Sequence, residues 1–322
     1  MKKYLLLLLL SVFISSCVQT GTKLLTNRSQ EIPLNYESDQ SMMPVSEIIM
    51  EDPLLIPKER FSSEKIIRSY QSAYPDRISE ISYRGDDWAM KVYDQWYYWA
   101  DGKLLPENMI SRKDEFNSYP YYNYPEDLPV FQELPQETKD RLDDMLKNRK
   151  TDPLERYPGF LNSLWRIYDR ETSWNRVKTT YFLGFKLQIH RDLLEDLANV
   201  EEEIQRRMLV DSELRRFVQS LQRVDGYNWR RIAETETLSV HSYGIALDLI
   251  LGNSSNREIY WLWAKNKGLD WYDVPYEKRF SPPLTFIQTF EKHGFIWGGK
   301  WLFFDTIHFE YRPEILILNG IR

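Results

Sequence analysis

Two short segments near the C-terminus combine histidines with carboxylates in a pattern that suits metal-dependent hydrolysis. The first segment holds His241 and Asp248, and the second holds Asp305 and His308. Catalytic zinc sites use three protein ligands and leave a fourth position for water. A further carboxylate beside the ion can accept the proton of that water. The candidate ligands are therefore His241, Asp248 and His308, and Asp305 remains as a candidate base.

The chain has four histidines, and a single histidine is more often a structural residue than a ligand. We interpret His190, at the start of an expected helix, as structural. We interpret His293 in the same way, because a cation near the C-terminus of a helix suits the helix dipole. His241 and His308 lie beside acids and glycines, and spacing alone leaves both the structural and the metal-binding interpretation open.

Strands are expected to position these side chains. Residues 245–249 alternate between apolar and small or acidic types, which predicts a half-buried strand with Asp248 opposite the apolar face. Residues 303–311 predict a second strand. A regular strand would put Asp305 and His308 on opposite faces. A bulge or turn at the residue after Asp305 would bring the two side chains together.

The combined pattern resembles the zinc D-alanyl-D-alanine peptidases. It reads Ser-x-His-x-x-Gly-x-Ala-x-Asp from Ser239 and Asp-x-x-His-Phe-Glu from Asp305. That family includes VanY-type carboxypeptidases, the vancomycin-resistance D,D-dipeptidases and certain phage L-alanyl-D-glutamate endolysins. The resemblance covers residues 175–318 and implies a bound Zn²⁺ ion. Carried over to this sequence, the zinc ligands are His241, Asp248 and His308, and the general base is Asp305.

The same resemblance implies two substrate-binding residues, Arg230 and Ser239. An arginine can hold a carboxylate through two parallel hydrogen bonds, which suits the C-terminal carboxylate of a stem peptide. The alternative is that Arg230 or Arg231 pairs with a surface acid such as Glu234. Residues 233–236 depart from the Gly-Thr pair expected in the family, which predicts a differently shaped loop before Ser239.

The N-terminus has the pattern of an export signal. Two lysines precede an apolar run of about eleven residues, which is too short to span a bilayer. The run ends at Ser-Ser-Cys17, which resembles the bacterial lipoprotein box and implies a lipid anchor on Cys17, the only cysteine. A plain secretory signal with a chance cysteine is the alternative. We therefore expect a signal peptide over 1–16, the lipidated cysteine and a flexible tether over 17–60, and an exported protein held at the bacterial cell envelope.

The rest of the chain predicts an α+β fold with two regions. Residues 61–175 contain a β-hairpin or meander and a Tyr- and Pro-rich loop at 117–135, read as loop packing in preference to a ligand platform. Residues 176–322 form the expected catalytic domain. It has a small antiparallel sheet that carries the zinc site, with helices packed against it. The expected helices cover 137–148, 189–222 and 284–293.

Composition narrows the function. The formal net charge of -6 argues against nucleic-acid binding, which favours a basic surface.

Hydrolysis of peptidoglycan stem peptides by a D-alanyl-D-alanine carboxypeptidase is the preferred interpretation. The alternatives are an L-alanyl-D-glutamate endopeptidase and a non-catalytic peptidoglycan-binding lipoprotein. Asp305 favours an enzyme, because a structural zinc site needs no acid beyond its ligands. The sequence leaves the oligomeric state open.

Overall fold

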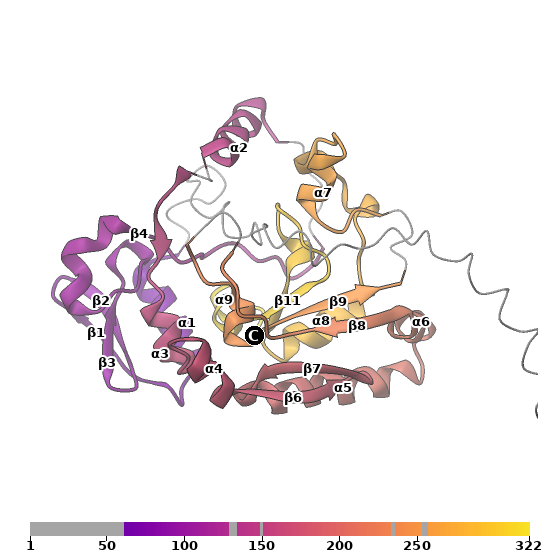
Figure 1. The fold of residues 1–322 in the computed structure, drawn as a ribbon, viewed down its shortest axis with the longest axis horizontal. Coiled ribbons are helices and arrows are strands. Elements are labelled where there is room, and N and C mark those ends of the chain that lie inside the picture. The colour runs from indigo at the N-terminus through magenta and orange to yellow at the C-terminus, as the bar shows by residue number, and fades with distance from the viewer. Residues whose placement is uncertain (1–60, 129–133, 149–150, 233–235, 253–256) are drawn as a thin grey trace, which may run out of the picture. The chain divides into compact units, whose positions relative to one another are not determined.

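The computed structural model describes residues 61–128, 134–148, 151–232, 236–252 and 257–322 (Figure 1). The expected signal peptide, Cys17 and the tether lie outside the described residues. The described helices are α1 (Ser63–Ala73), α2 (Gln136–Asn148), α3 (Gly159–Trp165), α4 (Arg170–Arg176), α5 (Leu194–Met208), α6 (Ser212–Ser220), α7 (Trp261–Asn266), α8 (Leu284–Lys292) and α9 (Pro313–Leu318). None of these helices is long and apolar enough to cross a membrane.

Short antiparallel sheets accompany the helices, as an α+β sequence predicts. The described strands are β1 (Ile78–Arg84), β2 (Asp87–Val92), β3 (Gln95–Tyr98), β4 (Phe116–Asn117), β5 (Glu155–Arg156), β6 (Val177–Phe182), β7 (Phe185–His190), β8 (Leu221–Asp225), β9 (Ala246–Leu251), β10 (Phe295–Trp297) and β11 (His308–Tyr311). Strands β1 to β3 form the expected meander, and β6 pairs with β7. Strands β4 and β5 form a short parallel pair.

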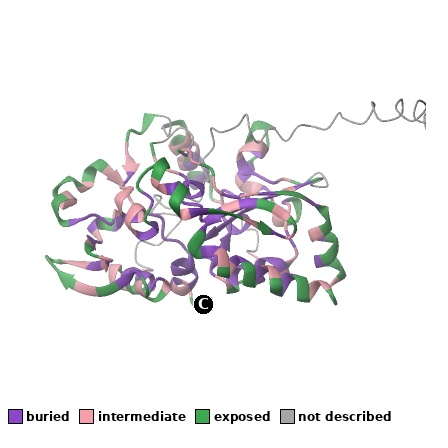
Figure 2. Ribbon diagram, turned by 60° about the horizontal axis from the view of Figure 1, so that its bottom comes forward, coloured by how far each residue is buried: buried purple, intermediate pink, exposed green. Residues whose placement is uncertain are grey.

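The four-stranded sheet, in the order β10-β11-β9-β8, lies at the centre of the C-terminal part. All three of its pairings are antiparallel. Helix α8 contacts β10, and α5 contacts α8. Buried residues concentrate on these strands, while the exposed residues of the helices face outward (Figure 2). Strand β9 is buried on both faces, which corrects the prediction of a half-buried strand, because Leu247, Leu249 and Leu251 pack in the hydrophobic core while His241 and His308 cover Asp248 on the other face.

Two further predictions about element boundaries are wrong. The expected helix over 189–222 is two helices, α5 and α6, flanked by β7 and β8. The break occurs where the Asp211 side chain accepts hydrogen bonds from Glu213 N–H and Leu214 N–H, and so begins α6. The expected strand over 303–311 begins only at His308, because Thr306 and Ile307 form a turn.

One hydrophobic core joins the N-terminal elements to the C-terminal sheet. It includes apolar side chains of α1, of the Tyr-rich segment and of the four-stranded sheet. Helix α1 lies against α9. The tyrosines at 119, 121, 122 and 124 are buried, as expected for a loop that packs against the protein. The predicted helices at 137–148 and 284–293 are confirmed within one residue at each end, as α2 and α8.

Candidate metal centre

Two neighbouring strands hold two of the candidate ligands. Asp248 on β9 and His308 on β11 are direct partners in the antiparallel register. Such partners project from the same face of a sheet with neighbouring Cβ atoms about 4.5–5.5 Å apart. The sequence therefore needs only the correct pairing of β9 with β11 to place an acid beside a histidine.

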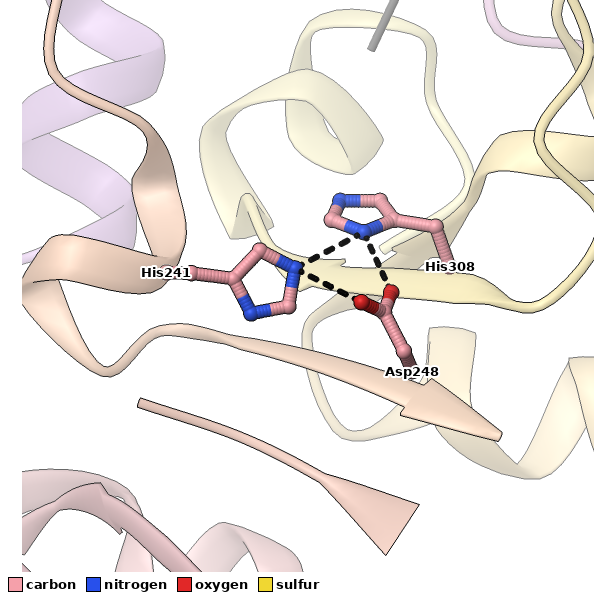
Figure 3. Close-up of side chains that lie close together, drawn as sticks. All are labelled: His241, Asp248 and His308. Atoms are coloured by element: carbon pink, nitrogen blue, oxygen red, sulfur yellow. Dashed lines mark hydrogen bonds and ion pairs between the residues drawn. The ribbon is translucent and has the colours of Figure 1, made fainter. Parts of the chain in front are cut away.

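His241 reaches the same point from a short helical turn, Val240–Tyr243, that precedes β9. Gly244 ends this turn with φ +65°, a conformation that other residues rarely adopt. A Cβ atom there would lie 2.8 Å from the backbone nitrogen of His190. The glycine therefore lets the chain reverse sharply between His241 and β9, and this reversal brings the imidazole back over Asp248 (Figure 3).

The ligand atoms of the three side chains converge to slightly less than the spacing of a tetrahedral metal site. His241 Nε2 lies 3.3 Å from His308 Nδ1 and 3.2 Å from Asp248 Oδ2. His308 Nδ1 lies 3.0 Å from Asp248 Oδ1. A tetrahedral ion with ligand bonds of ~2.0–2.2 Å places neighbouring ligand atoms about 3.3–3.6 Å apart. All three side chains are at least 97% buried, so they meet in the interior of the protein and not at its surface.

The outer nitrogens of both histidines have acceptors that determine the tautomers. His241 Nδ1 lies 2.7 Å from the carbonyl oxygen of Gly226, and His308 Nε2 lies 3.1 Å from Glu310 Oε2. A carbonyl and an ionised carboxylate can only accept, so each outer nitrogen carries a proton. In the neutral imidazoles, the two inner nitrogens then present lone pairs to each other and to Asp248. Two lone pairs and a carboxylate at this spacing favour a positive charge between them, either a proton on His308 Nδ1 or a metal ion, and His241, Asp248 and His308 thus fit a metal ion.

The electrostatics of the cluster also favour positive charge. Burial would lower the pKa of His308, but hydrogen bonds to Asp248 and Glu310 raise it to about 10. Burial opposes ionisation of Asp248, yet His241 and His308 hold its pKa well below the ordinary value. His308 likewise lowers the pKa of the buried Glu310. The surrounding carboxylates therefore stabilise a cation at the point where the ligands meet.

A turn at Thr306 and Ile307 separates Asp305 from His308, and the charges of His308 and Asp248 both act on the Asp305 carboxyl, which is therefore near the ligands. Its backbone N–H donates to Gly298 O at 3.1 Å, and its carbonyl accepts from His308 N–H at 3.3 Å. The turn was one of the two arrangements that the sequence left open. Burial raises the pKa of Asp305 to about 7, while the charges of His308 and Asp248 act on it in opposite directions. Within the described part of the chain, Asp305 Oδ1 is buried without a hydrogen-bond partner, which leaves it available for a water or a substrate.

Arg230 lies in the irregular segment after β8. Its backbone N–H donates to Ser242 Oγ at 2.9 Å, which fixes the segment against the His241 turn. Its positive charge opposes the burial that raises the pKa of Asp305, so the guanidinium is within electrostatic range of the candidate base. Arg231 instead pairs with Glu236 at 2.6 Å. Glu234, the other expected partner, lies outside the described residues.

Ser239 is fully buried, and its hydroxyl accepts a hydrogen bond of 3.3 Å from His241 N–H. It begins the turn that carries the first ligand. Among the described residues, the other two histidines are not part of the ligand group, and their side chains contact other parts of the protein. His190 Nε2 contacts the carbonyl of Trp165 at 3.0 Å, and His293 ends α8.

Sequence reasoning missed two groups that orient the ligands, Gly226 and Glu310. The signal for Glu310 was present, because residues two apart on a strand share a face, and Glu310 is two residues after His308. Gly226 carried no signal in the sequence. Its role depends on β7, where a Cβ atom on Gly226 would lie 2.1 Å from the carbonyl oxygen of Gln188.

Two family models match parts of the chain. Residues 233–311 match a model described as D-alanyl-D-alanine carboxypeptidase. This segment contains the three candidate ligands and Asp305, so the match supports a metallopeptidase of that family for the C-terminal part. Residues 66–121 match a model that describes a domain of unknown function. No curated protein and no solved structure matches the chain significantly.

Proposed function

We propose that this protein is a zinc-dependent peptidase that hydrolyses peptidoglycan stem peptides as a D-alanyl-D-alanine carboxypeptidase. The observation that carries the proposal is the convergence of His241, Asp248 and His308 at ligand spacing, with the buried, unpartnered carboxyl of Asp305 within electrostatic range of them. The family match over 233–311 supports the substrate class. A structural metal site would need no free buried acid, so the arrangement favours catalysis over binding alone.

His241, Asp248 and His308 would hold the zinc ion. When bound, zinc supplies Lewis-acid chemistry, because it polarises a carbonyl and acidifies water. Asp305 would accept the proton of the attacking water and return it to the leaving amine. A base is most effective when its pKa is near the working pH, and burial raises the pKa of Asp305 to about 7. The same carboxyl can therefore both take up and release a proton near neutrality.

Arg230 would bind the terminal carboxylate of the stem peptide. Among the described residues its guanidinium has no hydrogen-bond or ion-pair partner, so its donors are available to a ligand. The fork of an arginine holds a carboxylate by two parallel bonds and sets its orientation, which a lysine cannot reproduce. Ser239 would contribute to the substrate site through its buried hydroxyl, which accepts a hydrogen bond from the backbone N–H of His241.

The location of the protein follows from the N-terminal sequence. Cys17 would carry a lipid anchor, and residues 17–60 would tether the enzyme so that it reaches the cell wall from the membrane. Two or more acyl chains anchor a protein stably, whereas one is marginal.

Digestion of purified muropeptides tests the proposal. Zinc-loaded protein is incubated with muropeptides that end in D-Ala-D-Ala, and the products are identified by mass spectrometry, with Asp305→Asn as the matched control. Release of one terminal alanine by the wild-type protein and not by the control is the expected result. A cut between L-Ala and D-Glu would replace the carboxypeptidase by an endopeptidase. Muropeptide binding without hydrolysis by the zinc-loaded protein would replace the enzyme by a binding protein.

A further inference from the structure

A Tyr-rich segment of the N-terminal part, residues 118–128, is held to the C-terminal part through its own backbone. We call this segment the strap. Arg312 Nη2 donates to Pro120 O at 3.2 Å, and Asn319 Nδ2 donates to Tyr122 O at 3.0 Å. Lys300 Nζ donates to the carbonyls of residues 125 and 126 at 2.9 and 2.7 Å. Three side chains from beyond residue 299 thus hold four backbone carbonyls of the strap.

One of these side chains also leads to the candidate metal centre. Arg312 Nη1 donates to Glu310 Oε1 at 3.4 Å, and the other oxygen of Glu310 contacts His308 Nε2 at 3.1 Å. Arg312 Nε donates to Glu314. The second oxygen of Glu314 accepts from the hydroxyl of Tyr74 at 2.9 Å, immediately after α1. All of these side chains are at least 90% buried, so the chain of contacts is screened from water.

We propose that Arg312 is a positioning residue of the metal centre, through which the strap and the end of α1 orient His308. This inference rests on the metal site of the proposed function and extends it to the N-terminal part of the chain. Arg312 contacts Glu310, Glu314 and Pro120 O with three different nitrogens. The planar guanidinium therefore ties the position of Glu310 to that of the strap and Tyr74. Glu310 in turn orients His308.

The contacts of Arg312 depend on its positive charge and on the planar shape of its guanidinium. Glu310 is a buried carboxylate that would be costly without a cation beside it. A lysine in place of Arg312 keeps the charge but cannot hold three partners in fixed directions. Outer groups that orient a metal-binding histidine typically change metal affinity by 10–100-fold when they are altered. We therefore expect the loss of the Arg312 fork to weaken metal binding although Arg312 does not touch the ion.

The proposal also gives a role to the segment that matches a domain of unknown function. Residues 66–121 contain Tyr74 and Pro120, the two groups that hold Glu314 and Arg312. In this account the N-terminal part is a support for the catalytic site and not a separate binding module.

Zinc affinity of the full chain tests the proposal. The dissociation constant is measured by competition with a chromogenic chelator, the absorption spectrum is recorded with Co²⁺ in place of zinc, and thermal unfolding reports stability. Arg312→Lys should fold, bind zinc about 10–100-fold more weakly and show an altered Co²⁺ spectrum. Asn319→Ala is the matched control, because it removes the strap contacts at Tyr122 and Tyr124 and leaves the contacts of Arg312 with Pro120 and Glu310 in place. It should lose stability yet bind zinc with wild-type affinity.

A second variant keeps the test decisive if Arg312→Lys does not fold. Glu310→Gln retains an oxygen toward His308 and removes the ionic contact with Arg312, and it too should bind zinc at least about tenfold more weakly. Wild-type affinity in either folded variant would overturn the proposal, as would equal losses in Arg312→Lys and Asn319→Ala. These measurements need no peptide. A zinc-binding protein that hydrolyses nothing would refute the proposed function alone, and a wild-type protein that binds no metal would refute both.

Discussion

Replacing Asp305 by asparagine should raise the stability of the metal-free protein and lower the activity of the zinc-loaded protein. Asparagine has nearly the size and shape of aspartic acid but cannot ionise. In the metal-free chain, burial raises the pKa of Asp305 to about 7, whereas an unfolded chain titrates near ~3.9. The folded protein therefore keeps a proton on Asp305 that the unfolded chain has already released, and its stability falls as the pH rises from about 4 to about 7.

The magnitude follows from this difference in pKa. A shift of about 3 pH units corresponds to at most ~4 kcal/mol of lost stability above pH 7. The asparagine side chain of the variant has no such loss, so metal-free Asp305→Asn should be more stable than the wild type. The advantage should grow by roughly 2–3 kcal/mol between pH 5 and pH 8.

Urea unfolding in the presence of a chelator, at both pH values and for both proteins, measures this change. Comparing the variant with the wild type at each pH cancels the titration of all other groups. An advantage that does not change between the two pH values would show that Asp305 is already ionised at the lower one, and would refute the reasoning from burial. In the zinc-loaded state the same variant should retain the metal and lose turnover by ~10²–10⁴-fold. Near-normal activity there would exclude Asp305 as the base.

Three further predictions concern the metal, the substrate and the membrane. Zinc should bind at about one equivalent per chain, and His241→Ala or His308→Ala should remove most of it; full zinc in both variants by metal analysis would refute the ligand assignment. Arg230→Lys should lower kcat/KM by roughly 10–100-fold on a free-acid peptide, because a charge-assisted bond is worth about 1.5–3 kcal/mol, and should have no effect on the amidated peptide. An equal loss on both peptides would make Arg230 structural. Cys17→Ala should move the protein from the membrane to the soluble fraction, and membrane fractionation that survives a high-salt wash would point to another anchor.

The sequence by itself determined the chemistry that is available and the local elements that carry it. The ligand types, the acid before the last histidine and the limits of α2 and α8 all follow from motifs and periodicity. These depend on residues that are close in the chain, and their physical causes, such as capping and amphipathic period, act over a few residues.

Tertiary structure decided everything that depends on contacts between distant segments. The turn between Asp305 and His308 forms where Thr306 N–H donates to Ile259 O and residue 305 bridges Tyr260, contacts that no local period encodes. The tautomer of His241 depends on Gly226, which can approach β7 only because it lacks a side chain. In the sequence, Arg312 is an ordinary charged residue. Its role depends on the strap, which is distant in the sequence and contacts Arg312 only in the folded chain. Once buried, these charged side chains pair with one another, because each buried charge needs a partner that only the folded chain can supply.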